Sequence, residues 1–345
     1  MSQMQTYLER LMRGENLSTE EMKEAIASCF KPSITNTEIA ALLTALKIKG
    51  ETPEEIAGMV EVIQSKSELA SLDLPNVMDN CGTGGDRSNS FNISTTTSFV
   101  LAGAGMTVAK HGNRSVSSKT GSADVLEELG VGLTLSREQT AKILQENRIA
   151  FLFAPHVHQN LRPFMKVRTE LGLPTIFNLI GPLTNPLPLE TQLVGVYDRS
   201  KLKIIAKSLH KLGRKRAIVV NGAGYMDEAS LAGKNYIALL QDGKIEQFTL
   251  HPEELGLPVY PNEAIRGGDA KKNAKILLSV LKNEPGPYLD TVLFNASLGL
   301  YANGIAKSLK EGLERAQESI ASGAALERLQ QLVKLSKTTK TSGVS

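Results

Sequence analysis

Apolar residues in the first part of the chain recur at the spacing of α-helices. Residues 4–70 predict three or four short helices in succession, and one of them gathers apolar side chains on a single face: Ile39, Leu42, Leu43 and Leu46. Ser18 and Glu21 have the spacing of a capping box, and Thr52 followed by Pro53 marks another helix start. These signals predict a small all-helical domain over residues 1–72.

The pattern changes after residue 75. Short apolar runs bounded by Gly or Asp then alternate with longer segments of helical period, and the predicted strands are 76–80, 106–110, 150–153, 191–197, 216–221 and 291–295. Such alternation is typical of a mainly parallel sheet flanked by helices, with ligand loops at the carboxyl ends of its strands. We therefore expect an α/β catalytic domain over residues 73–345. Its polar tail, from residue 337, is expected to be disordered.

The composition is that of an ordinary globular protein. The chain has 345 residues, of which 41% are hydrophobic, and this length is enough for two domains. The net charge is only +3, which is too small to attract nucleic acid or a membrane over the whole surface. The longest uncharged stretch, residues 88–109, opens with polar residues and predicts no membrane span. The N-terminal segment shows no apolar signal-peptide core, so we expect a cytoplasmic protein without nucleic-acid or membrane partners.

The cysteines and histidines do not predict a metal centre. Cys29 and Cys81 are far apart and have no second Cys at metal-ligand spacing, which argues against a zinc site and against a disulfide framework. His156 and His158 have no third His, Cys or acid nearby, so a metal pair is not expected there.

A glycine-rich loop follows the first predicted strand. Residues 79–86 read DNCGTGGD, and residues 92–95 then begin a long uncharged helix. Glycines let backbone amides approach an anion closely, and a helix N-terminus adds the positive end of its dipole. The loop matches neither the dinucleotide pattern nor a Walker A loop. It predicts a phosphate cradle, with a tight structural turn as the alternative.

A second polar segment follows the next predicted strand. Residues 110–118 read KHGNRSVSS and combine two cations, an imidazole, an amide and three hydroxyls. This density of donors suits a phosphorylated ligand, with Lys110 as a point charge and the hydroxyls as adaptable donors. Each of these residues taken alone, such as Arg114 or Ser117, could equally be a solvated side chain.

Four motifs together resemble the anthranilate phosphoribosyltransferase family. They are GTGGD, FNIST, KHGNRSVSSKTGSADVLEELGV and TIFNLIGPLTNP, in this order and spacing. The resemblance extends from residues 40–60 to residues 294–304. It implies a nucleoside phosphorylase/phosphoribosyltransferase-like fold, in which a small helical domain, joined by helices around 160–188, is hinged to the α/β domain. It also implies a homodimer that uses Mg²⁺, with phosphoribosyl pyrophosphate and anthranilate as substrates in tryptophan biosynthesis.

The resemblance further implies roles for individual residues. Phosphoribosyl pyrophosphate would be held by Gly82, Gly85, Asp86, Ser90, Asn92, Ile93, Ser94, Thr95, Lys110, His111, Gly112, Asn113, Arg114, Ser115, Val116, Ser117, Ser118 and Ser122. Asn113 and Arg168 match the anthranilate contacts, and His158 matches a position beside the anthranilate path. Ser94, Asp227 and Glu228 match the metal ligands. Lys110, Asp227 and Glu228 are the implied catalytic residues.

The carboxylate pair Asp227–Glu228 also makes chemical sense on its own. It follows the predicted strand 216–221, and hard oxygen ligands are those that Mg²⁺ selects. An Asp-Glu pair on a loop is nevertheless more often a solvated surface. The stretch 220–228 departs from the common family pattern, because it lacks a histidine, an acid and a glycine ahead of the pair.

The implied reaction is displacement at C1′ of phosphoribosyl pyrophosphate by the anthranilate amine. The aromatic amine is already neutral near pH 7, so catalysis should depend on positioning and on charge stabilisation at the leaving group. Closure about a hinge near residues 71–75 would exclude water. Ser94 and the carboxylate pair would hold Mg²⁺, and Lys110 would fix the phosphates.

Two other functions remain possible from the residues alone. A nucleoside phosphorylase of related fold would be expected to have a different phosphate loop, and a non-catalytic nucleic-acid-binding relative would be expected to have lost the carboxylates. Residues 199–216 carry eight Lys or Arg and no acid, which nucleic acid or an acidic partner could use. A crossover helix with a solvated face is the favoured interpretation, because no aromatic residue is interleaved for base stacking.

Overall fold

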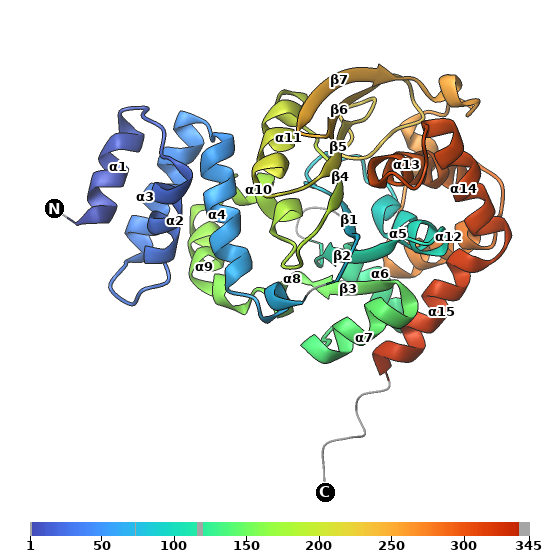
Figure 1. The fold of residues 1–345 in the computed structure, drawn as a ribbon, viewed down its shortest axis with the longest axis horizontal. Helices are drawn as coiled ribbons and strands as arrows, with labels where there is room; N and C mark the ends of the chain where they lie inside the picture. Colours follow the sequence, from blue (N-terminus) through green and yellow to red (C-terminus); the bar gives the residue numbers. More distant parts are fainter. Residues whose placement is uncertain (1, 73, 116–119, 338–345) are drawn as a thin grey trace, which may run out of the picture.

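The structure is a computed structural model and describes residues 2–72, 74–115 and 120–337 (Figure 1). In these residues a bundle of helices stands beside a sheet of seven strands that carries helices on both faces. This arrangement confirms the predicted fold class, an α/β domain with a mainly parallel sheet and a smaller helical part at the N-terminal end.

The N-terminal bundle is built from short, well-capped helices. They are α1 (Gln3–Met12), α2 (Thr19–Ser28), α3 (Asn36–Lys49) and α4 (Pro53–Ser65). Ser18 and Thr52 close full capping boxes at the starts of α2 and α4, as predicted. The predicted apolar face of α3 is buried. It shares one core with Phe164 and Phe177, which lie on helices that follow the third strand.

The sheet has the strand order β3-β2-β1-β4-β5-β6-β7. The strands are β1 (Val77–Gly82), β2 (Thr107–Gly112), β3 (Ile149–Phe153), β4 (Thr191–Gly195), β5 (Arg216–Asn221), β6 (Asn235–Gln241) and β7 (Lys244–Leu250). The first five run parallel, and β6 and β7 are antiparallel. Five of the predicted strands are therefore found, within a few residues of their predicted ends.

The hairpin of β6 and β7 was not predicted. Its turn is Asp242–Gly243, and both residues have left-handed φ angles, 50° and 74°. This is the geometry of a two-residue hairpin turn, which favours Asp-Gly. The signal was therefore present in the sequence between two runs rich in strand-forming residues.

The predicted strand 291–295 is wrong. These residues lie in α13 (Pro287–Asn303), which packs between β4 and β5 on one side and two other helices on the other. Because α13 is buried almost all round, it has no polar face, and its apolar run cannot be told from a buried strand by periodicity.

Most of the remaining helices pack around the sheet, whereas α9 packs against α3 of the bundle. They include α5 (Ile93–Gly103), α6 (Ser122–Glu128), α7 (Arg137–Asn147), α8 (Ala154–Val157), α9 (Arg162–Leu171), α10 (Phe177–Ile180), α11 (Leu202–Lys211), α12 (Ala270–Leu281), α14 (Leu309–Ala321) and α15 (Ala324–Lys337). Short 3-10 turns lie at 68–71, 159–161, 181–184, 199–201, 252–255 and 262–265. Lys337 ends α15, and the rest of the tail predicted to be disordered lies outside the described residues. No helix in the described ranges is long and apolar enough to cross a membrane.

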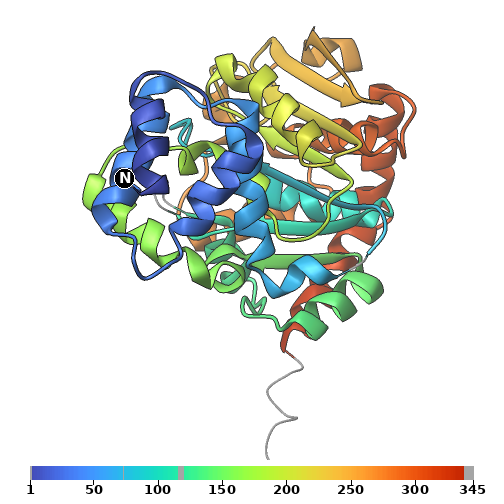
Figure 2. The same cartoon turned by 60° about the vertical axis from the view of Figure 1, so that its left-hand side comes forward.

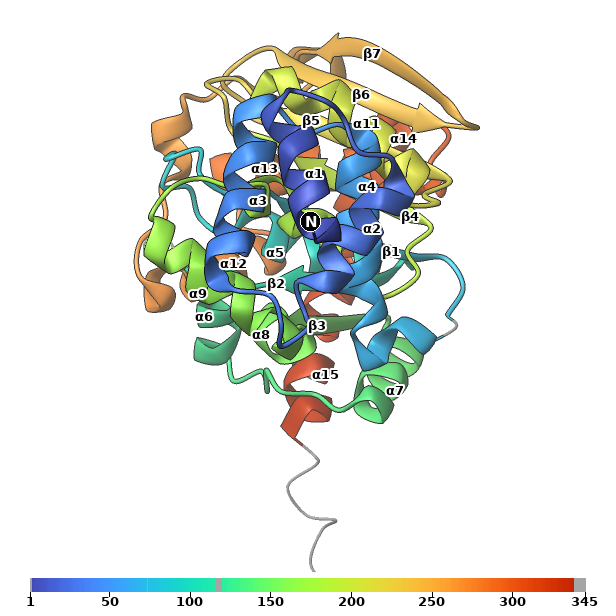
Figure 3. The same ribbon diagram turned by 90° about the vertical axis from the view of Figure 1, so that its left-hand side faces the viewer.

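The basic segment 199–216 contains α11, which packs against α4 of the bundle (Figures 2 and 3). Lys211 pairs with Glu54 at 2.9 Å, and Lys201 pairs with Glu51 at 3.4 Å. Lys215 pairs with Glu190 at 2.6 Å. Part of the basic run therefore meets acids of this same chain. The prediction of a crossover helix is confirmed by α11.

Candidate active site

The predicted ligand loops meet at one edge of the sheet. Gly82 ends β1 and is paired in register with Gly195, the end of β4, while Gly112 ends β2 beside them. The chain order of the strands reverses between β1 and β4, and ligands of open α/β sheets bind at such a reversal, outside the carboxyl ends of the strands.

The glycine-rich loop needs its glycines for backbone geometry. Gly84 and Gly85 have φ angles of 70° and 84°, which lie in the left-handed region. Both residues are exposed. Gly84 N–H donates a hydrogen bond to Asp227 Oδ2 at 2.6 Å. The loop thus joins the first strand to the predicted metal carboxylates.

Asp227 is wedged between two strand ends. A Cβ built on Gly195 would overlap the Asp227 carbonyl oxygen, and one built on Gly82 would overlap its carboxylate. Only glycine at both positions leaves room for the acid loop, which we define as residues 222–228. Sequence reasoning missed Gly195, and its only signal was a glycine at the end of a predicted strand.

Glu228 faces the start of α5. Its Oε1 accepts a hydrogen bond from Ser94 N–H at 3.2 Å, and the Ser94 side chain also bonds to this carboxylate. Burial raises the pKa of Glu228 to about 7, against the opposing effects of Lys110 and Ser94. The pKa of Asp227 is raised well above its usual range, first by burial and then by the nearby charges of Asp86 and Glu228.

Three carboxylates therefore gather where few side-chain cations balance them. Asp86 accepts a hydrogen bond from Ser88 N–H at 3.0 Å, and its other oxygen has no hydrogen-bond partner among the described residues. In the described ranges no three His, Cys, Asp or Glu side chains form a ready metal cage. Mg²⁺ commonly takes one or two protein carboxylates and completes its shell with substrate phosphates and water.

Lys110 and His111 stand on β2 over a buried acid. Lys110 is 3% exposed, and its charge lies near Glu228 and Asp79. Asp79 accepts hydrogen bonds from His111 N–H at 3.2 Å and from Asn185 Nδ2 at 3.0 Å. Burial raises the pKa of Asp79, while Lys110 and these bonds act in the opposite direction. The acid anchors β2 to the base of the site.

The imidazoles of His111 and His158 stack edge to face, with their centroids 5.2 Å apart. Burial lowers the pKa of His158 to about 4 and holds that of His111 well below its usual range. Among the described residues neither Nε2 atom has a hydrogen-bond partner, although both rings are buried. His156 lies apart from this pair, because its Nε2 bonds to the Leu135 carbonyl oxygen at 3.0 Å.

The segment after β2 is only partly described. Val116, Ser117 and Ser118 lie outside the described residues. Arg114 is exposed and pairs with Asp124 and Glu127, while Asp124 also accepts hydrogen bonds from the backbone of Ser115 and Gly121. Asn113 is exposed, and its carbonyl oxygen accepts a hydrogen bond from the Ser122 hydroxyl at 3.2 Å. A hollow of about 640 Å³ opens beside these residues.

The start of α5 completes the phosphate side. Asn92 precedes the helix, as predicted, and its Nδ2 donates to the Thr120 carbonyl oxygen at 3.3 Å. Ile93 and Thr95 are buried beneath the site, each 1% exposed. Ser90 accepts a hydrogen bond from the Ser88 hydroxyl at 3.2 Å.

Arg168 lies on α9. Its guanidinium stacks over the Phe177 ring, 5.0 Å from the centroid, and burial lowers its pKa. Within the described part of the chain Arg168 forms no ion pair, although Glu170 lies two residues further along the sequence. Phe177 begins α10, which leads to the turn whose backbone bonds to His111 and His158.

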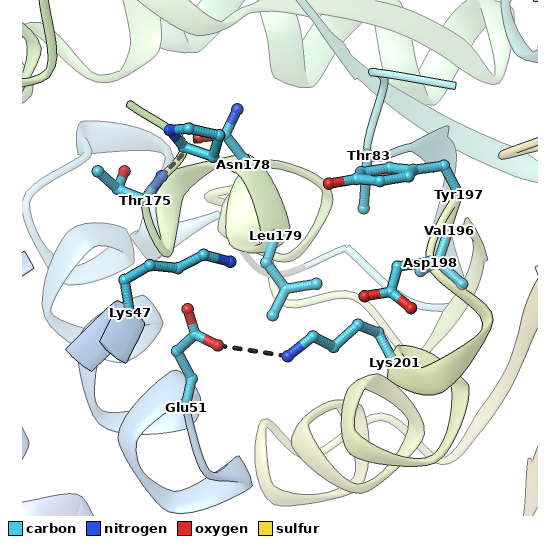
Figure 4. Close-up of a pocket in the computed structure, with 11 residues that line it drawn as sticks. Lys47, Glu51, Thr83, Thr175, Asn178, Leu179, Val196, Tyr197, Asp198 and Lys201 are labelled. Atoms are coloured by element: carbon cyan, nitrogen blue, oxygen red, sulfur yellow. Dashed lines mark hydrogen bonds and ion pairs between the residues drawn. The ribbon is translucent and has the colours of Figure 1, made fainter. Parts of the chain in front are cut away.

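A small cavity of about 30 Å³ lies where the bundle meets the glycine-rich loop. Figure 4 shows Lys47 and Lys201 pointing into it from opposite sides, with the Glu51–Lys201 ion pair along one wall. Thr83 and Tyr197 line the other end. The cavity therefore lies between residues of the bundle and Thr83 of the glycine-rich loop.

The arrangement matches a known family over most of the chain. Residues 5–67 match the helical bundle domain and residues 74–326 match the a/b domain of the glycosyl transferase family. An anthranilate phosphoribosyltransferase of Oceanobacillus iheyensis is 57% identical over 331 residues, which are 96% of this chain and 97% of that protein. The chain belongs to the anthranilate phosphoribosyltransferase family.

Solved structures of the family have the same fold. The enzyme of Thermus thermophilus superposes with a TM-score of 0.90 at 39% identity, covering 96% of this chain and 99% of that chain. The enzyme of Saccharomyces cerevisiae in complex with PRPP and Mg gives 0.87 at 28% identity, over 96% and 97% of the two chains. The same yeast enzyme in complex with 4-fluoroanthranilate gives 0.85 at 28% identity, over 97% and 98%.

Proposed function

We propose that this chain transfers the phosphoribosyl group of 5-phosphoribosyl 1-pyrophosphate to the amine of anthranilate, in tryptophan biosynthesis. The observation that carries this proposal is the convergence of the glycine-rich loop, Lys110 and the Asp227–Glu228 pair at one sheet edge. The C1′–oxygen bond breaks with its electron pair going to pyrophosphate. A C1′–nitrogen bond forms, and the amine loses one proton.

The acid cluster fits Mg²⁺. Asp227, Glu228 and the Ser94 hydroxyl are oxygen ligands of the kind that Mg²⁺ prefers, and buried carboxylates of like charge need a cation or a proton to balance them. When bound, the ion would neutralise charge that develops on the departing pyrophosphate. We assign these three residues as its ligands.

The chain's own groups would fix the phosphates. Lys110 offers a buried charge beside the acids, and Gly85 is an exposed residue of the glycine-rich loop, whereas the Gly84 N–H is already bonded to Asp227. The N-terminus of α5 adds the positive end of a helix dipole. Gly82, Gly85, Asp86, Ser90, Asn92 to Thr95, Lys110 to Ser118 and Ser122 make up the proposed phosphoribosyl pyrophosphate site.

Anthranilate would bind between β2 and the helices after β3. We assign its carboxylate to Arg168, whose guanidinium can form two parallel hydrogen bonds, with Asn113 as a second contact. The amine N–H groups would donate hydrogen bonds to the Nε2 lone pairs of His111 and His158, because both imidazoles are held neutral by burial. No strong base is needed, since an aromatic amine is neutral at pH 7.

Closure of the bundle over the α/β domain would exclude water. We place the hinge near residues 71–75, of which residue 73 lies outside the described ranges. The Glu51–Lys201 pair joins the bundle to the turn before α11, and the cavity beside Thr83 lies between the bundle and the glycine-rich loop. Excluding water protects the reactive C1′ centre from hydrolysis.

The protein would act as a homodimer through its helical bundle. Four large apolar side chains are exposed on α1, α3, α9 and the residue pair after α9: Met12, Ile48, Met165 and Leu173. These helices contact one another, since α3 packs against both α1 and α9. Exposed apolar patches mark interfaces, and a second copy is the occupant that the family implies. Ile48→Asp should shift the sedimentation mass from dimer to monomer, whereas an unchanged mass would exclude this face.

We place the reaction in the cytoplasm. Cys29 and Cys81 are both free thiols, which fits a reducing compartment.

The test is an assay of transfer. The protein is incubated with Mg²⁺, phosphoribosyl pyrophosphate and anthranilate, and the loss of anthranilate fluorescence is followed, with Mg²⁺ omitted as a control. Loss of fluorescence that requires all three components supports the proposal. Unchanged fluorescence, or phosphate-dependent cleavage of a nucleoside instead, would overturn it.

A further inference from the structure

The segment that leads into α12 contacts two loops of the proposed phosphate site, the one before α5 and the one after β2. We define this clamp as residues 265–273, which connect a 3-10 turn to the first turn of α12. Phe91 N–H donates to the Ile265 carbonyl oxygen at 3.1 Å, and Gly267 N–H donates to the Asn89 carbonyl oxygen at 2.9 Å. These bonds flank a short antiparallel bridge between Ser90 and Arg266.

The clamp also reaches the loop after β2. The Thr120 hydroxyl donates to the Gly268 carbonyl oxygen at 2.7 Å. Helix α12 packs along α6, the helix that follows this loop. One short segment therefore contacts the start of α5 and the end of the segment that contains Arg114 and Ser115, although the two loops come from different strands.

Asn273 is the centre of the clamp. This side chain is 2% exposed, and its Nδ2 donates to Asn92 Oδ1 at 2.8 Å while its Oδ1 accepts from Gly268 N–H at 2.7 Å. Asn92 in turn donates to the Thr120 carbonyl oxygen. The bonds form a closed ring through Gly268, Asn273, Asn92 and Thr120, which fixes the direction in which the Asn92 amide points.

Gly267 shows how closely the segments approach. A Cβ at this position would lie 2.7 Å from Asn273 Oδ1 and 2.9 Å from Phe91 Cα, closer than side chains tolerate. The clamp is therefore a built contact, in which a glycine is required to let Asn273 and the phosphate loop meet.

We propose that Asn273 is a positioning residue of the phosphoribosyl pyrophosphate site, acting through Asn92 and Gly268. This inference rests on the proposed function, because it takes that compound as the ligand of Asn92. Asn273 does not touch the ligand in this account. Its effect is to hold the two loops in the spacing that one ligand must span.

Two substitutions separate the bonds. Asn273→Ala removes both, whereas Asn273→Asp can still accept from Gly268 N–H but faces Asn92 Oδ1 with an acceptor. We expect Asn273→Asp, which loses one bond and leaves Asn92 Oδ1 facing an acceptor, to raise the KM for phosphoribosyl pyrophosphate about 10-fold, and Asn273→Ala, which loses both bonds, to raise it at least as much. The KM for anthranilate should change less than about twofold.

Asn147→Ala is the matched control. Asn147 is also buried, 1% exposed, and donates to the Arg328 and Ile149 carbonyl oxygens at the opposite edge of the sheet. It should lower the melting temperature without changing either KM. Equal KM values in the parent and Asn273→Asp, or the same rise in Asn147→Ala, would show that Asn273 is merely structural.

A calorimetric titration of the protein with phosphoribosyl pyrophosphate, in the presence of Mg²⁺, distinguishes failure of the Asn273 proposal from failure of the proposed function. A parent protein that binds the ligand but transfers nothing to anthranilate overturns the proposed function and leaves the clamp testable by affinity. We then expect about 10-fold weaker binding by Asn273→Asp. A parent that binds no ligand overturns both.

Discussion

The acid loop and the segment after β2 serve the same site but are held in different ways. Asp227 is held by tight packing, since it lies against Gly82 and Gly195 and its carboxylate accepts a hydrogen bond from the Gly84 N–H. Arg114, in contrast, has a side chain that is 46% exposed and is tied to two acids of its own chain. Asp227, a proposed metal ligand, is therefore held by tight packing, whereas Arg114, proposed to bind phosphate, is held by ion pairs with Asp124 and Glu127.

The acid loop has further support outside its own residues. Arg199 stacks over the Tyr236 ring at 3.6 Å and the Tyr225 ring at 4.8 Å, and its Nε donates to Asn221 Oδ1 at 3.0 Å. Tyr225 has a φ of 62°, a strained angle for a side chain of this size. Asn221 and Tyr225 stand where the family commonly has histidine and glycine. The contacts of Arg199 with these two residues hold the acid loop in place despite the changed sequence.

The largest effect is expected where the fit is tightest. Gly195→Ala would place a methyl group on the Asp227 carbonyl oxygen and displace Asp227, one of the proposed metal ligands. We expect transfer to fall by at least about 1,000-fold, measured as kcat/KM in the fluorescence assay. Gly256→Ala is the control, because nothing lies within 4 Å of a Cβ built there, and its left-handed φ of 73° adds a backbone strain that Gly195, in its strand, does not have. A Gly195→Ala enzyme with activity near that of the parent would contradict the close fit.

Removing charge without changing shape should have the next largest effect. Asp227→Asn and Glu228→Gln keep the size of each side chain, and we expect kcat to fall about 100- to 1,000-fold with a higher Mg²⁺ requirement. Without Mg²⁺ the variants should melt no lower than the parent, because repulsion among Asp86, Asp227 and Glu228 is relieved. Normal turnover at limiting Mg²⁺ would remove these acids from the metal site.

Arg168→Ala tests the anthranilate side. We expect the KM for anthranilate to rise about 10- to 150-fold, which corresponds to a charge-assisted contact of roughly 1.5 to 3 kcal/mol. The KM for phosphoribosyl pyrophosphate should change much less, and Arg168→Lys should restore binding only in part. Equal losses for both substrates would show that stacking on Phe177, rather than the carboxylate, is what the side chain provides.

The buried imidazoles make the β2 side sensitive to acid. The pKa of His158 falls from about 6.5 in an unfolded chain to about 4 here, so the unfolded state binds the extra proton between these values. The stability from His158 is present above pH 6.5 and is lost as the pH falls toward 4. We expect His158→Gln to remove about 1 to 3 kcal/mol of this pH dependence, measured by urea unfolding at pH 7.5 and 4.5. A variant with the parent's pH dependence would contradict this.

Local signals allowed part of this structure to be predicted. The capping boxes at Ser18 and Thr52 and the glycine-rich loop each act within a few residues, and the structure confirms them. The close packing of Asp227 against Gly195 depends on strand register. The proposed role of Asn273 depends on a contact with Asn92, which is 181 residues away in the sequence. Such contacts leave no local pattern. The missed Asp242–Gly243 hairpin is different, because its signal was local.

The smallest effect is expected from releasing Arg114. Glu127→Gln would remove one of its two carboxylate partners, while Asp124 would stay because it also binds the Ser115 and Gly121 amides. An exposed ion pair contributes about 0.2 to 1 kcal/mol, so the KM for phosphoribosyl pyrophosphate should fall by at most about fivefold, most clearly at low salt. Glu128→Gln changes the net charge equally at the next position, on the same hollow. If both variants lower the KM alike, the effect comes from the negative charge near the hollow in general. If only Glu127→Gln lowers it, the ion pair with Glu127 restrains Arg114, as the comparison with the acid loop requires.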